Sequence, residues 1–93
     1  MRSAAQEQES VEVLDEVVVA DVRDLVVFND DVNTFDHVIR TLVKVCSHTP
    51  EQAEQCAMIV HYRGKCTVKN GSLQELRPMR DAICEAGIDA RIL

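Results

Sequence analysis

The feature that most constrains the fold of this chain is an apolar run that stops abruptly at a polar cluster. Residues 25–28 are all apolar, and Asn29-Asp30-Asp31 follow at once. A short apolar run bounded by turn-forming residues predicts a buried strand, which we expect over residues 24–28. Asn and Asp suit the turn because their side chains hydrogen-bond to nearby backbone groups. With His61 from a later helix, this amide and these carboxylates could grip a small cationic group.

A first helix is predicted after this turn. In residues 35–46, apolar side chains recur at every third or fourth position, which is the spacing of one helix face. Asn33 or Thr34 can cap the first turn of this helix. Ser47-His48 then interrupts the apolar pattern, so we expect the helix to end there.

A second helix and a strand follow. Thr49-Pro50 is a strong start signal, because Thr is a good N-cap and Pro is tolerated at the first helical position. The apolar face of this helix leads to His61, and Gly64 ends it. Residues 65–69 alternate in polarity as a strand does, and Asn70-Gly71 should then turn the chain.

The last part of the chain predicts a third helix and an edge strand. Ser72 begins a capping box, but Pro78 lies where an interior amide should donate. Either residues 73–77 form a separate turn and the helix starts near Pro78, or the helix bends there. Gly87 should end the helix, and residues 88–93 can return as a strand. The order β-α-α-β-α-β indicates an α+β two-layer sandwich, in which a three-stranded antiparallel sheet carries the helices on one face.

Composition narrows the classes of partner. The 93 residues suffice for one domain, and their formal charge of −6 argues against nucleic acid or an anionic membrane as the main partner. Residues 1–22 are rich in Glu, Gln, Ser and Asp, and we expect a flexible acidic extension there, with a short strand around residues 17–20 as an option. Residues 23–93 should form the folded core. No apolar run is long enough for a membrane span, and the N-terminus lacks the layout of a signal peptide, so we expect a cytoplasmic protein. We expect a monomer, because the domain is small, with a charged surface and an exposed site.

The four cysteines favour buried thiols in a reducing compartment. They form no C-x-x-C pair, and most fall where periodicity asks for a small apolar side chain. Zinc is the alternative, with His37, His48 and His61 as further ligands, but none of these residues has the spacing of a structural zinc site. We therefore expect no metal and no cofactor.

Three segments together resemble the ClpS family of proteolytic adaptors. They are the Asn29-Asp30-Asp31 box after an apolar strand, the helix start at residues 35–39, and the run Val60-His61-Tyr62-Arg63-Gly64-Lys65. The resemblance covers residues 23–93 and implies a fold related to the C-terminal domain of the ribosomal stalk protein. It also implies an adaptor that makes and breaks no bond. Such adaptors bind substrates whose free first residue is large and apolar, and they deliver these substrates to the N-terminal domain of a Clp-type AAA+ unfoldase.

The resemblance also assigns roles to individual residues. Asn29, Asp30 and His61 would hold the α-amino group, and Asp31 would orient the loop or contact the peptide backbone. Where many relatives carry methionine, this chain has Phe35 and Ala57. This substitution suggests a rigid wall and spare volume, a pocket suited to Phe, Tyr or Trp. The predicted ligand-binding residues are Asn29, Asp30, Asp31, Thr34, Phe35, Ala57, Val60 and His61.

The unfoldase contact is expected on the third helix, with Glu75, Arg77 and Arg80 as candidates, although a solvated charged face also explains such residues. The acidic extension resembles one that is thought to reach the pore of the unfoldase. Two other readings stay open. In an enzyme, His61 would work with Asp30 or Asp31, or Cys66 would be a nucleophile. A scaffold domain would dock another protein without recognising an amino terminus, and the Asn-Asp-Asp cluster would then be only a turn and helix cap.

Overall fold

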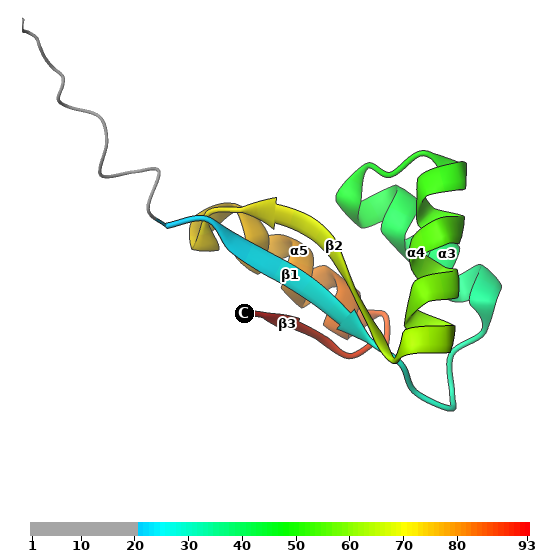
Figure 1. The fold of residues 1–93 in the computed structure, drawn as a ribbon. Coiled ribbons are helices and arrows are strands. Elements are labelled where there is room, and N and C mark those ends of the chain that lie inside the picture. Colours follow the sequence, from blue (N-terminus) through cyan, green and yellow to red (C-terminus); the bar gives the residue numbers. More distant parts are fainter. Residues whose placement is uncertain (1–20) are drawn as a thin grey trace, which may run out of the picture.

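The structure, a computed structural model, describes residues 21–93. The expected short strand at residues 17–20 and nearly all of the acidic extension lie outside the described residues. The element order confirms the predicted β-α-α-β-α-β arrangement (Figure 1). The elements are β1 (Arg23–Phe28), α3 (Phe35–Cys46), α4 (Pro50–Arg63), β2 (Lys65–Gly71), α5 (Leu73–Glu85) and β3 (Ala90–Ile92). In residues 21–93, no helix has the length and apolar character needed to span a membrane.

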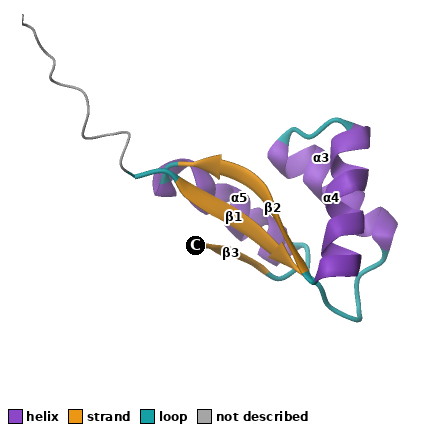
Figure 2. Cartoon of the chain, viewed as in Figure 1, coloured by secondary structure: helices purple, strands orange, loops and turns teal. Residues whose placement is uncertain are grey.

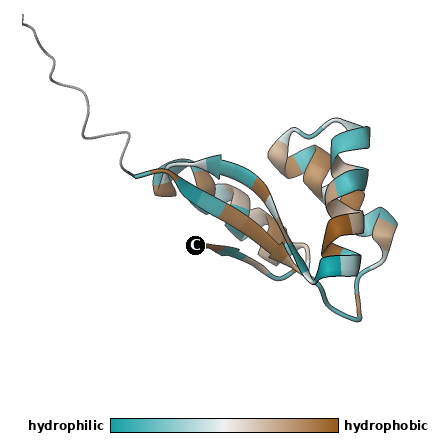
Figure 3. Ribbon diagram, in the orientation of Figure 1, coloured by the Kyte–Doolittle hydropathy of each residue, from teal (hydrophilic) through white to brown (hydrophobic). Residues whose placement is uncertain are grey.

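The sheet is three-stranded, antiparallel and centred on β1, in the order β2-β1-β3. In its register, Val27 of β1 lies opposite Cys66 of β2 and Ala90 of β3. Figure 2 shows α5 running along the sheet, while α3 and α4 form a helical pair beside β2. The apolar second half of β1 therefore lies at the centre of the domain (Figure 3).

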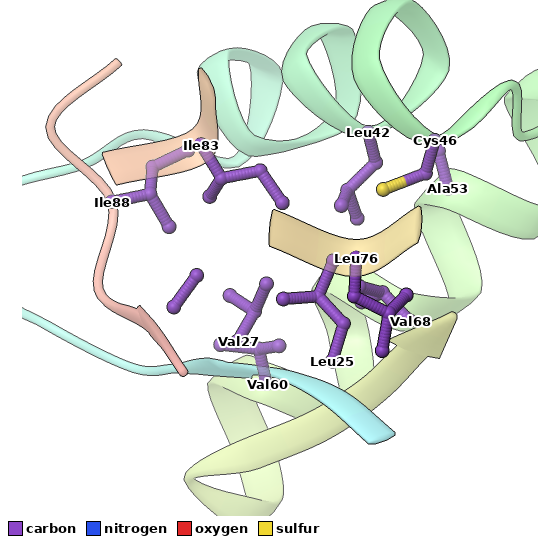
Figure 4. Close-up of a cluster of buried hydrophobic side chains, with 11 residues drawn as sticks. Leu25, Val27, Leu42, Cys46, Ala53, Val60, Val68, Leu76, Ile83 and Ile88 are labelled. Carbon is purple, nitrogen blue, oxygen red and sulfur yellow. The ribbon is translucent and has the colours of Figure 1, made fainter. Parts of the chain in front are cut away.

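The core lies between the sheet and the helices. Figure 4 shows its side chains converging from β1, β2 and helices α3, α4 and α5. Burying a large aliphatic side chain stabilises the fold by roughly 1.5–3 kcal/mol, so this cluster fixes where the ends of β1 and α4 lie. The largest fully buried side chains belong to Leu25, Val27, Leu42, Cys46, Leu76 and Ile83.

Each helix begins at a side-chain cap. Thr34, one of the two residues expected to cap α3, accepts a hydrogen bond from the backbone N–H of His37 at 3.1 Å. Thr49 caps α4 in the same way, and Ser72 forms a reciprocal capping box with Glu75. These caps satisfy backbone donors that have no partner within the helix.

The structure corrects two local predictions, the turn at Asn70-Gly71 and the bounds of the last strand, and it decides between the two alternatives for the third helix. Asn70-Gly71 is not a turn but the end of β2, because these residues pair with Asp24 and Arg23 of β1. Helix α5 is continuous from Leu73, with Pro78 inside it, so residues 73–77 are not a separate turn. The last strand spans only Ala90–Ile92 and not residues 88–93. Ile88 is buried in the connection between α5 and this strand.

The cysteines are less buried than expected. Only Cys46 is fully buried, Cys56 and Cys66 are half-buried, and Cys84 is exposed. All four are free thiols. The prediction of mostly buried thiols was therefore wrong for Cys84, which lies on the solvent side of α5 and contacts the backbone of Ala90 through its Sγ atom.

Candidate functional site

A pocket of about 390 Å³ opens where the end of β1, the start of α3 and the last turns of α4 meet. All eight residues predicted to bind a ligand line this pocket. Asn33 and Val38 also line it, although the sequence suggested only a helix cap for Asn33 and a core position for Val38. The lining residues are Asn29, Asp30, Asp31, Asn33, Thr34, Phe35, Val38, Ala57, Val60 and His61.

One backbone hydrogen bond brings the two sides of the pocket together. The N–H of Asn29 donates to the carbonyl of Gly64 at 2.8 Å, so the end of β1 is fixed to the end of α4. Gly64 adopts a φ of 93° and ends the helix, a conformation that glycine adopts without steric cost. This turn places His61, one helical turn earlier, beside the Asn-Asp-Asp cluster.

Asp30 organises the loop of residues 29–34, which we call the pocket loop. Its Oδ1 atom accepts hydrogen bonds from the backbone N–H groups of Val32, at 2.9 Å, and Asn33, at 2.8 Å. Its Oδ2 atom accepts a bond from the Asn33 side chain at 2.7 Å. These bonds, led by the one from the Asn33 backbone, lower the pKa of Asp30 below its ordinary value. The carboxylate therefore stays ionised at neutral pH.

Asp31 differs from its neighbour. It is exposed and lines the pocket, and no described residue donates a hydrogen bond to its carboxylate. Its oxygens are therefore free to accept bonds from a ligand. The two adjacent carboxylates give the rim of the pocket its negative charge.

Two side chains tie this region to the end of α5. Asn33 donates its second side-chain N–H to the carbonyl of Gly87 at 2.8 Å. The Nε2 atom of His37 lies 2.7 Å from the carbonyl of Ala86 and must donate to it, because a carbonyl can only accept. The pocket loop and the first turn of α3 are therefore held to the chain that joins α5 to β3.

The other side of the pocket is aromatic and apolar. The rings of Phe35 and His61 meet edge to face, with their centroids 5.6 Å apart, and the ring of Tyr62 meets that of His61 in the same way at 4.8 Å. No described residue hydrogen-bonds to the ring nitrogens of His61, so they can meet a ligand. Ala57, 3% exposed, and Val60, 5% exposed, supply buried apolar surface. The pocket thus combines an anionic rim with an apolar base.

Of the residues considered for enzymatic chemistry, His61, Asp30 and Asp31 line the pocket together, whereas the candidate nucleophile Cys66 lies elsewhere. Burial, followed by the neighbouring Cys56, raises the pKa of Cys66 to about 12. The reactive thiolate is therefore scarce at neutral pH. Within the described part of the chain, no group of three or more His, Cys, Asp or Glu residues is placed to hold a metal ion.

The candidate unfoldase-contacting residues all lie on α5, away from the pocket. Glu75 belongs to the capping box of this helix, where its Oε1 atom accepts a bond from the Ser72 N–H at 3.0 Å. Arg77 is exposed. Arg80 pairs with its neighbour Asp81 at 2.7 Å. Glu75 therefore has a structural role of its own, whereas the Arg77 side chain is available to a partner.

Two comparisons with known proteins indicate one family, and a third shows a similar fold. The model of the family described as ATP-dependent Clp protease adaptor protein ClpS matches residues 21–89. The ATP-dependent Clp protease adapter protein ClpS of Thermosynechococcus vestitus is 32% identical over 65 residues, 69% of this chain and 69% of that protein. The fold is similar to that of Agrobacterium tumefaciens ClpS2 bound to L-phenylalaninamide, with a TM-score of 0.68 and 18% identity over 78% of this chain and 95% of that one. Because the family model spans most of the chain and the Thermosynechococcus adaptor is similar in sequence, the protein belongs to the ClpS family of Clp protease adaptors.

Proposed function

We propose that this adaptor binds the free amino-terminal residue of substrate proteins and delivers these substrates to a Clp-type AAA+ unfoldase. The observation that carries the proposal is the composition of the pocket, whose anionic rim adjoins an apolar base. An amino-terminal residue offers the matching pair of groups, a charged amine next to a side chain. An internal residue of a protein has no such amine.

The amine would be held at the rim. A protonated amine carries three donors, and the pocket offers the amide oxygen of Asn29, a ring nitrogen of His61 and a carboxylate. The resemblance to the family implied that Asp30 binds the amine and that Asp31 orients the loop or contacts the peptide backbone. The hydrogen bonds of Asp30 favour the opposite division, because its oxygens already bind Val32 and Asn33. We therefore assign the amine to Asp31 and the ordering of the pocket loop to Asp30.

The side chain of the first residue would enter the apolar part of the pocket. Val38, Ala57 and Val60 supply aliphatic surface there, and Phe35 supplies an aromatic wall. The small Ala57 side chain leaves room for a large ligand, and aromatic pairs gain about 0.5–1.5 kcal/mol beyond the area they bury. This lining favours Phe, Tyr or Trp as the first residue.

The Agrobacterium structure supports the proposal at the level of the fold. L-phenylalaninamide, the ligand in that structure, has a free amine, an aromatic side chain and an amide in place of the following peptide bond. It therefore represents the first residue of a polypeptide. In the present chain the corresponding chemistry would be met by Asp31 and His61 at the rim and Phe35 at the wall.

Delivery requires a second surface, and the adaptor itself would make and break no bond. Helix α5 presents Arg77 to solvent on a face that does not line the pocket. A substrate in the pocket and an unfoldase N-terminal domain on α5 could therefore bind together. Glu75 and Arg80 remain candidates for the same surface.

Fluorescent peptides of one sequence test the proposal. Their first residue is Phe, N-acetylated Phe or Val, and binding is measured by anisotropy to the wild type, His61→Ala and the control Arg63→Ala. Acetylation removes the charge and two donors, and charged hydrogen bonds contribute about 1.5–3 kcal/mol each. We expect the free Phe peptide to bind about 100-fold more tightly than its acetylated copy, and His61→Ala to lose most of this affinity while Arg63→Ala keeps it. Equal binding of all three peptides would refute amino-terminal recognition and favour the scaffold reading.

A further inference from the structure

The side chain of Asn33 connects the pocket loop to the segment that follows α5. One side-chain N–H donates to Asp30 Oδ2 at 2.7 Å, and the other donates to the Gly87 carbonyl at 2.8 Å. The backbone N–H of Asn33 donates to Asp30 Oδ1 at 2.8 Å. Both hydrogens of the amide therefore have acceptors, which fixes the orientation of the amide group.

The segment around Gly87, to which Asn33 bonds, is fixed by backbone hydrogen bonds and by the core. The N–H of Gly87 donates to the Cys84 carbonyl at 3.0 Å, and the N–H of Ile88 donates to the Ile83 carbonyl at 3.2 Å. Ile83 and Ile88 both belong to the buried core. Asn33 thus connects an exposed loop to a rigid part of the domain, 54 residues away in sequence.

The hydrogen bonds of Asn33 restrain the orientation of the Asp30 carboxylate. Without these bonds, the Asn33 amide and the Asp30 carboxylate would bond to water instead, because the pocket loop is largely exposed. The Asp30 carboxylate accepts hydrogen bonds from the backbone N–H of Val32 and from the backbone and side chain of Asn33. These three bonds fix the conformation of the pocket loop. The side chains on either side of Asp30, those of Asn29 and Asp31, are then presented to the pocket.

We propose that Asn33 is a positioning residue for amino-terminal recognition, which locks Asp30 and anchors the pocket loop on Gly87 so that Asn29 and Asp31 face the amine. This inference rests on the proposed function. Asn33 lines the pocket, but both of its side-chain N–H groups already have acceptors in the protein, so we assign its effect to Asp30 and the pocket loop. Its effect on binding should therefore be accompanied by a change at Asp30.

The chain contains a matched control. Asn70 also donates its side-chain N–H to a carboxylate, that of Asp24, but this pair joins β2 to β1 at the end of the strands remote from the pocket. We expect Asn33→Ala to weaken binding of the free Phe peptide about tenfold, and Asn70→Ala to change it less than about twofold. Asn33→Asp preserves the size of the side chain but cannot donate to Asp30, so it should weaken binding at least as much. Circular dichroism and urea unfolding verify that each variant is folded.

The pKa of Asp30 provides a second readout, which a merely structural role would not move. The Asn33 side chain is one of the groups that lower this pKa, so Asn33→Ala should raise it toward the ordinary value while the backbone bonds remain. The Asp30 carboxyl carbon is followed by NMR as pH falls below about 5. Its own resonance separates it from the nearby titratable groups, Asp31 in the loop, His37 on α3, His61 on α4 and Asp89 after Gly87.

The outcomes separate this inference from the proposed function. Weaker binding by Asn33→Ala together with a raised Asp30 pKa supports the positioning role. Unchanged binding, or weaker binding with an unmoved Asp30 pKa, overturns it and leaves amino-terminal recognition standing. If the wild type itself does not bind the free Phe peptide, both proposals fail.

Discussion

Asp30 and Asp31 are adjacent aspartates whose surroundings differ, and we therefore assign them different roles in the proposed site. Asp30 accepts three hydrogen bonds from the pocket loop, and these hold its pKa below the usual range. Asp31 is exposed at the rim, and no described residue donates to it. The family resemblance placed both carboxylates at the site, but it gave them roles opposite to those that their hydrogen bonds favour. The division of roles depends on which backbone N–H groups the loop turns toward each side chain.

Phe35 and Ala57 should determine which first residues are preferred. Ala57→Met fills the base of the pocket, so we expect a loss of affinity of about tenfold for a Trp-initiated peptide and a smaller loss for a Leu-initiated one. Phe35→Met removes an aromatic partner worth about 0.5–1.5 kcal/mol, which should lower the ratio of Phe to Leu affinity roughly two- to tenfold. Competition binding with Leu, Phe and Trp peptides measures both ratios.

Met58→Ala is the control for these substitutions. Met58 lies on α4 but does not line the pocket, and it is 45% exposed, so its truncation should leave all three affinities unchanged. Binding of Leu-initiated peptides alone by the wild type would contradict the aromatic preference. The ratio of affinities is the informative quantity, because Phe35 also contacts His61 and its loss can weaken every peptide.

Helix α5 contains a proline at an interior position, where proline usually bends or ends a helix. Pro78 lies inside the helix, where it has no N–H to donate to the preceding turn. The helix nevertheless begins at Leu73, because the Ser72 capping box starts it there and Leu76 is fully buried in the core. Capping and burial on the N-terminal side of Pro78 outweigh the missing hydrogen bond.

Replacing Pro78 should therefore stabilise the domain. An interior proline costs about 3 kcal/mol relative to alanine, and part of the gain is offset by the greater freedom of the unfolded chain, about 0.4–1 kcal/mol. We expect Pro78→Ala to raise the free energy of unfolding by about 2 kcal/mol and the melting temperature by about 8–16 °C. Gln74→Ala, an exposed change on the same helix, should have little effect. Urea and thermal unfolding measure both, and an unchanged or lowered stability would show that α5 accommodates Pro78 without strain.

The end of β2 shows where local signals mislead. Asn70-Gly71 is a strong turn signal, but in the structure these residues continue the strand opposite Asp24 and Arg23. The Asn70 side chain bonds to the Asp24 carboxylate across the two strands. This contact joins residues 46 positions apart, so a reading of short segments could not anticipate it.

Across the whole molecule, the periodicity of the sequence predicted the elements, whereas the pocket residues were predicted from the resemblance of two motifs to the ClpS family. Phe35 opens α3, and the spacing of Ala57 and His61 by one turn of α4 places both on the same side. The sequence could not reveal that Asn33 bonds to Gly87 or that Gly64 bonds to Asn29. Those contacts depend on how the hairpin of α3 and α4 packs against the rest of the domain.

The most direct test of the account is a titration of the isotope-labelled protein with L-phenylalaninamide, followed by two-dimensional NMR. We expect chemical-shift changes concentrated in the pocket loop and in the last two turns of α4, around Ala57 and His61. N-acetyl-phenylalaninamide, which keeps the ring but lacks the charged amine, should cause no such changes. Equal responses to the two compounds, or changes centred on another surface, would contradict the assignment of this pocket to the free amino terminus.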